Sequence, residues 1–267
     1  MVKKAMALAS SARPIEGAVA TLGVSDRVTF LRKTYAHLGI ALLAFAAITG
    51  GLMRFAPKIS WGFSKWALQG RWTWLAVIGL FMVVGYVAEK LATSDRSRGT
   101  QYAGLGLAVA AEALLLQPML WILMLKFGTP ETMFTFTESG TEIIPALSPV
   151  AASILTQAVV ITLAIFGGLT AVVFVTKKDF SFMRGVLTVL TFGALGVIVA
   201  SLMFGFSLGA VFSGAMILLM AGYILYQTSL VMAHFPPTGY VAASLMLFST
   251  IATLFWYVLR LLMSLRD

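Results

Sequence analysis

The chain has 267 residues, of which 60% are hydrophobic and 11% are charged, with a mean hydropathy of +0.94. This composition excludes a water-soluble globular protein and predicts a membrane protein with several spans. The net charge of +9 does not indicate nucleic-acid binding, because an excess of Lys and Arg in a membrane protein usually lies in cytoplasmic loops. Since the chain has no cysteine, disulfides, iron–sulfur clusters and thiol catalysis are excluded.

Residues 1–35 are rich in Lys and Arg, and their apolar stretch at 5–9 is too short for the core of a signal peptide. We therefore expect a basic cytosolic tail, with a transit peptide as the alternative. Seven apolar runs follow, at about 36–53, 72–88, 102–125, 150–175, 185–204, 210–232 and 240–263. Each is close to the length of a helix that crosses about 30 Å of hydrocarbon.

The predicted fold class is therefore an all-α polytopic membrane protein, with seven transmembrane helices in one bundle over residues 36–263 and a short tail at 264–267. An eighth segment that crosses half of the membrane is left open. Lys and Arg are more numerous on one side of the bundle, which predicts a cytoplasmic N-terminus and an outer C-terminus. The loop at 126–149 then faces outward. Its acidic residues either concentrate cations near a pore or belong to a solvated, mobile connection.

The third run contains the one deeply placed carboxyl group of the predicted spans, that of Glu112. A carboxyl group at this depth either stays neutral, pairs with another polar group or lines a wet cavity, so Glu112 is a candidate for an ion path or pH sensor. Its structural alternative is a hydrogen bond that joins two helices. Gln117 and Pro118 follow in the same run, and a helix break there would free backbone carbonyls for an ion site, whereas a packing kink would not.

Enzymatic chemistry has weak support. Gly205 to Gly209 read G-x-S-x-G around Ser207, with His234 further along the chain, but this motif needs a strand–turn–helix context, and here it lies between two apolar helices. His37 and His234 are the two histidines, and they form no metal-ligand spacing. We therefore expect no enzyme and no cofactor, while a metal site stays undetermined.

Several stretches together resemble the Bax inhibitor-1 family, in the family's order, over roughly residues 29–263. They are TFLRKTY at 29–35, LQP at 116–118, TQA at 156–158, IFG at 165–167, TKKDF at 176–180, YILY at 223–226 and LRLL at 259–262. The last of these stretches contains Arg260, which corresponds to the arginine near the end of the family's last helix.

The resemblance implies a seven-helix bundle whose last helix is central, together with a pH-gated calcium leak. It also implies the alternative of a non-conducting regulator, because some bacterial relatives modulate a membrane-bound ATP-dependent protease and eukaryotic relatives suppress stress-induced cell death. The lipid bilayer would be a partner in either role. The leak would transport Ca²⁺ as its cargo, and the regulator would bind a membrane protein such as a protease. A bacterial inner membrane is the expected location.

The chain departs from the family at its pH sensor, which is a pair of aspartates. Gln227 stands at the first position and Thr250 at the second, ten residues before Arg260. An amide and a hydroxyl group can hydrogen-bond across two helices, but they do not titrate between pH 5 and 8. Either Glu112 has become the titrating group, or this member does not conduct calcium.

Overall fold

The computed structural model describes residues 23–94, 97–128, 133–137 and 140–266. Most of the expected cytosolic tail lies outside the described residues, as do Glu131 and Glu138 of the acidic loop.

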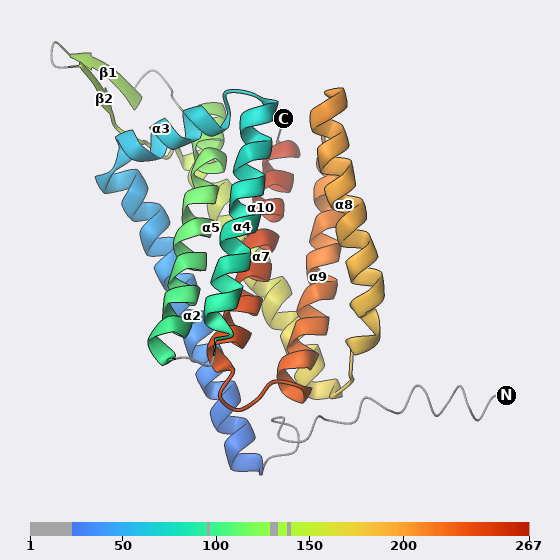
Figure 1. The fold of residues 1–267 in the computed structure, drawn as a ribbon. Helices are drawn as coiled ribbons and strands as arrows, with labels where there is room; N and C mark the ends of the chain where they lie inside the picture. The colour runs from blue at the N-terminus through green and yellow to red at the C-terminus, as the bar shows by residue number, and fades with distance from the viewer. Residues whose placement is uncertain (1–22, 95–96, 129–132, 138–139, 267) are drawn as a thin grey trace.

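The described residues form eight helices, a two-stranded antiparallel hairpin and a short 3-10 turn at Ser181–Met183 (Figure 1). The helices are α2 (Val24–Phe55), α3 (Pro57–Ala67), α4 (Arg71–Ala92), α5 (Arg98–Phe127), α7 (Pro149–Thr176), α8 (Arg184–Phe204), α9 (Ala210–Ala233) and α10 (Tyr240–Ser264), and the strands are β1 (Phe134–Thr137) and β2 (Gly140–Ile143). All helices except α3 are long and apolar enough to cross a membrane. The prediction of seven transmembrane helices is confirmed.

The first helix begins at Val24 rather than near residue 36, so the last part of the expected tail is helical. The polar residues in this stretch hide an amphipathic pattern, in which Phe30 and Leu38 are buried. Asp26 lies in the first turn, where a negative charge is favourable at a helix N-terminus.

Two elements lie in segments expected to be loops. The helix α3 begins with Pro57 and buries Ser60, Ser64 and Ala67 on one face, while Lys58 and Lys65 are exposed. It lies across one end of the bundle (Figure 1), as expected of an amphipathic helix at the membrane surface. The hairpin of β1 and β2 forms at the same end, so the acidic loop is partly structured.

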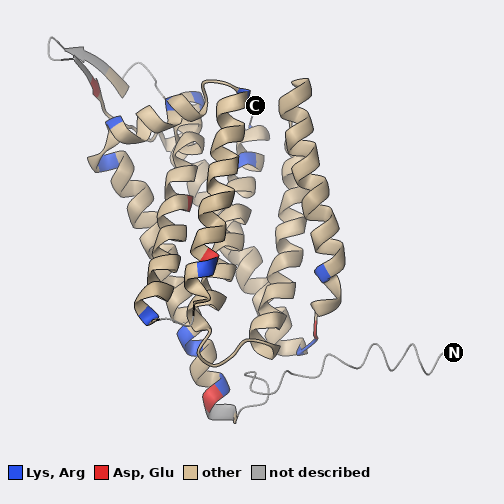
Figure 2. Ribbon diagram, viewed as in Figure 1, with Lys and Arg blue, Asp and Glu red and all other residues tan. Residues whose placement is uncertain are grey.

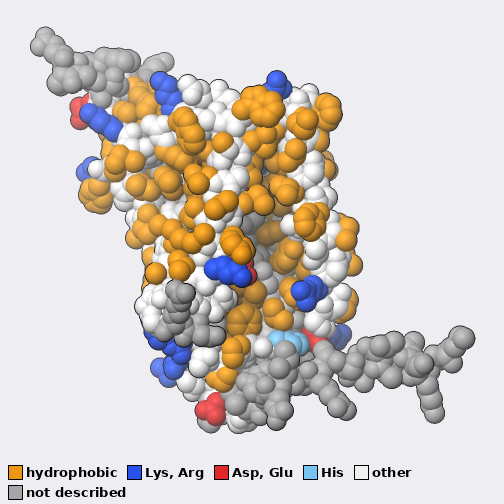
Figure 3. Space-filling model, viewed as in Figure 1, with side chains coloured by type: hydrophobic (Ala, Val, Ile, Leu, Met, Phe, Trp, Pro, Cys, Tyr) orange, Lys and Arg blue, Asp and Glu red, His pale blue; other side chains and the backbone are white. Residues whose placement is uncertain are grey.

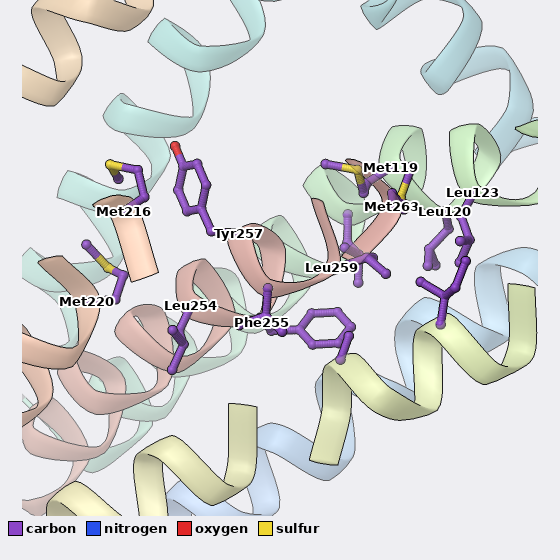
Figure 4. Packing of buried hydrophobic residues seen from close by; sticks show 14 of the residues in the cluster. Met119, Leu120, Leu123, Met216, Met220, Leu254, Phe255, Tyr257, Leu259 and Met263 are labelled. Atoms are coloured by element: carbon purple, nitrogen blue, oxygen red, sulfur yellow. The ribbon is translucent and has the colours of Figure 1, made fainter. Parts of the chain in front are cut away.

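The last helix occupies the centre of the bundle, as the resemblance implies. In the most apolar window of α10, 78% of the residues are buried, against 11% for α8 at the periphery. Figure 4 shows Leu254, Phe255 and Leu259 of α10 in the main buried cluster, which also includes side chains of α5, α7 and α9.

The surface is consistent with a bilayer environment. Lys and Arg gather mainly toward the two ends of the helices (Figure 2), and hydrophobic side chains cover most of the visible face between them (Figure 3). Many large apolar side chains of α4, α7 and α8 are exposed on the outside of the bundle. Lipid tails would cover these surfaces.

Candidate functional site

A neutral hydrogen bond occupies the two positions where the family's aspartates would stand. Thr250 Oγ1 donates to Gln227 Oε1 at 2.8 Å, and both side chains are buried between α9 and α10. The same hydroxyl lies 3.2 Å from the Met246 carbonyl oxygen. Because neither side chain titrates in the physiological range, this contact joins the two helices independently of pH.

Three further hydroxyl groups converge from α2, α7 and α9. The hydroxyls of Thr170 and Thr228 are hydrogen-bonding neighbours of the Tyr35 hydroxyl. Their geometry is poor, however, because none of the three oxygens forms a well-aligned hydrogen bond with a described residue. All three oxygens are shielded from solvent. The ring of Tyr35 is held against Phe166 and Phe174 of α7, with centroids 6.5 and 5.8 Å away.

We call Tyr35, Thr170, Thr228, Gln227 and Thr250 the polar layer. They come from α2, α7, α9 and α10, and Gln227 and Thr228 are neighbours on α9. Tyr35 is half-buried and the other four are buried, in a bundle that is otherwise packed mainly with apolar side chains. Oxygen atoms of this kind can bind water or a hard cation. The sequence analysis missed Tyr35, Thr170 and Thr228, because a hydroxyl within an apolar run carries no signal of what it faces.

Glu112 lies on the inward side of α5, one turn from buried Ala108 and one turn from buried Leu116. Within the described part of the chain, its carboxyl group makes no hydrogen bond or ion pair. The structure therefore does not link Glu112 directly to Gln227, Thr250 or Arg260.

Gln117 is fully buried in a hydrogen-bond network between α3 and α5. Its Oε1 accepts from Ser60 Oγ at 2.7 Å, its Nε2 donates to the Ala113 carbonyl at 2.8 Å, and Trp121 Nε1 donates to Ser60 Oγ at 2.8 Å. Of the two interpretations of Pro118, the helix break is not seen, because α5 continues as one helix from Arg98 to Phe127.

Arg260 and the G-x-S-x-G segment lie at the same end of the bundle. Arg260 Nη2 donates to the Leu208 carbonyl at 2.6 Å, which ties α10 to the turn between α8 and α9. Ser207 is exposed in that turn, which follows a helix rather than a strand. His234 follows the other end of α9, about 36 Å along the helix axis, so it is too distant to act as a base for Ser207.

No group of three His, Asp or Glu side chains that could hold a metal ion occurs among the residues that the structure describes. The arrangement of helices and the polar layer define a multi-pass α-helical membrane protein.

Comparison with known proteins then identifies the family. The family model described as "Inhibitor of apoptosis-promoting Bax1" matches residues 132–267. The chain is 30% identical to Bax inhibitor 1 of Schizosaccharomyces pombe over 249 residues, which cover 91% of this chain and 79% of the relative. The chain belongs to the Bax inhibitor-1 family.

Two other relatives match over shorter regions. The BI1-like protein of Arabidopsis thaliana is 35% identical over 41% of this chain and 44% of its own length. Uncharacterized protein PA2604 of Pseudomonas aeruginosa is 36% identical over 42% of this chain and 51% of its own length. No solved structure matches the chain.

Proposed function

We propose that the protein is a non-enzymatic leak for Ca²⁺ or another cation, and that the polar layer forms part of its path. The observation that carries this proposal is the convergence of the buried Tyr35, Thr170 and Thr228 hydroxyls from three helices, where they interact with one another but form no well-aligned hydrogen bond among the described residues. A buried hydroxyl whose hydrogen bonds are poorly formed is costly, and more so in a bilayer, where water is scarce. Water or a hydrated cation passing between α2, α7 and α9 would bind all three.

The proposed leak differs from the family pattern in its control by pH. The Gln227–Thr250 hydrogen bond carries no titratable group, so protonation at these two positions does not open or close the path. Glu112 is the carboxyl group deepest within the described spans, and it has no partner there. We assign any pH dependence of the leak to Glu112.

The test is calcium entry into liposomes that contain the purified full-length chain and a trapped calcium dye, from pH 5 to pH 8. The wild type is expected to leak with a rate that changes with pH, and Glu112→Gln to leak with a rate that does not. Glu89→Gln is the matched control, because Glu89 is exposed near the end of α4. An unchanged pH profile in Glu112→Gln would remove the assignment of Glu112, and the absence of entry at every pH would remove the leak itself.

The alternative is a non-conducting regulator that binds a membrane-bound ATP-dependent protease or another membrane partner. Its support is that the Gln227–Thr250 hydrogen bond and the Gln117 network fasten the bundle as a rigid scaffold would require. Binding would use the basic segment before α2. Deletion of residues 1–22 should then abolish capture of the partner, and full capture by the shortened chain would exclude this mode.

We place the N-terminus in the cytoplasm, and we place the protein in a bacterial inner membrane. The orientation is supported by the excess of Lys and Arg on that side of the spans. Protease protection of an N-terminal tag in inverted and right-side-out vesicles tests it.

A further inference from the structure

A long apolar groove lies between α2 and α7, with side chains of α5 and α10 as its floor. Its volume is about 900 Å³, which falls within the range of ligand-binding pockets. The lining is mostly carbon and includes Leu43, Leu120, Leu155 and Phe255. Further along the bundle, the ring of Tyr35 on α2 packs against α7. The groove thus lies toward the hairpin end of the two helices.

The length of the groove matches one leaflet of a bilayer. Its lining on α2 runs from Leu42 to Arg54, a distance of about 18 Å at 1.5 Å per residue. One leaflet contributes half of a hydrocarbon core about 30 Å thick. The amphipathic helix α3, with exposed Lys58 and Lys65, begins at Pro57, which lines the groove, and so marks the membrane surface at that end of it.

Two residues of opposite charge line the groove at the end near α3. Arg54, at the end of α2, and Glu142, in β2, both line the groove and are both exposed. They form no ion pair with each other. A separated positive and negative charge at the membrane surface complements a zwitterion better than it complements a single charge.

We propose that this groove binds a phospholipid whose headgroup carries a primary ammonium, of the phosphatidylethanolamine class. The phosphate lies against Arg54, the ammonium donates to the Glu142 carboxylate, and one acyl chain follows α2 and α7. A phosphatidylglycerol headgroup would bring a negative charge to Glu142 with no ammonium to offset it. A phosphatidylcholine headgroup has no N–H group to donate to that carboxylate.

The first test measures lipid binding to the full-length chain in detergent by native mass spectrometry, with the three headgroups on identical acyl chains. Phosphatidylethanolamine is expected to bind more tightly than the other two lipids, by up to about fivefold, because the charged contacts are solvent-exposed. Glu142→Gln should remove this preference, and Arg54→Gln should weaken binding of all three lipids. Lys65→Gln, at the same end but outside the groove lining, should change neither. Equal binding of the three lipids by the wild type would overturn the proposal.

The second test fills the groove. Gly50 lines it, and a Cβ atom there meets no atom within 4 Å, so Gly50→Leu places a side chain in open space. Gly39→Leu is the control, because Gly39 lies on the same helix, outside the groove lining, and also faces open space. Loss of lipid binding in Gly50→Leu alone supports the proposal. Retention of binding in Gly50→Leu, or equal loss in both variants, would overturn it.

Discussion

The hydrogen bond between Thr250 and Gln227 allows a quantitative test of the polar layer. Thr250→Val keeps nearly the same shape but removes the donor, which lies 2.8 Å from Gln227 Oε1. A buried acceptor left without its donor costs about 1–3 kcal/mol in water-soluble proteins, and hydrogen bonds between membrane helices average about 0.6 kcal/mol, with a maximum near 1.7. We therefore expect Thr250→Val to lower the free energy of unfolding by about 1 kcal/mol.

The assay is equilibrium unfolding in mixed micelles, followed by circular dichroism at pH 5 and at pH 8. Thr253→Val is the control, because the Thr253 hydroxyl donates to the Ser249 carbonyl one turn back on its own helix. A double-mutant cycle with Gln227→Leu isolates the contact, and its coupling energy should be the same at both pH values because neither side chain titrates. A coupling near zero, or one that changes with pH, would refute the reasoning.

Two further substitutions test how α3 and α4 pack against α5. Ser60→Ala should lower stability by about 2 kcal/mol in the same unfolding assay, because the indole of Trp121 loses its acceptor. Ser64→Ala should have little effect, because among the described residues its hydroxyl bonds to a backbone carbonyl one turn back. Gly104→Ala should lower the free energy of unfolding by about 1–3 kcal/mol, since its Cβ would lie 2.5 Å from backbone atoms of α4. In the control Gly106→Ala, the new Cβ meets open space, so this variant should be as stable as the wild type or more stable. Equal stability of the two alanine variants would contradict the α4–α5 packing.

The seven spans were predictable because a bilayer requires long apolar helices, and six of them begin and end close to the expected residues. The start of α2 at Val24 was not predictable. The charged residues after Val24 resemble a solvated tail, and only the burial of Phe30 shows that this stretch is part of a packed helix. The helix α3 was also missed. Its Lys and Trp residues resemble an interfacial loop, and its buried face consists of small residues with little hydrophobic signal.

The candidate site was less predictable than the fold. Positions 227 and 250 could be singled out only through the resemblance to the family, since an amide and a hydroxyl within apolar runs are not distinctive by themselves. The meeting of Tyr35 with Thr170 and Thr228 depends on how α2, α7 and α9 pack, which no local pattern encodes. That α5 continues through Pro118, and that Gln117 bonds to Ser60 of α3, likewise depend on packing that the local sequence does not encode.

The most direct test of the leak is whether water reaches the polar layer. Since the chain has no cysteine, Thr228→Cys introduces a single thiol, and its reaction with a small charged thiol reagent can be followed in liposomes. Leu254→Cys is the control, because Leu254 is fully buried in the apolar cluster. If a hydrated path crosses this layer, Thr228→Cys is modified rapidly and calcium entry falls, whereas Leu254→Cys is not modified. An unreactive thiol at position 228 in a folded protein would contradict a hydrated path through this layer.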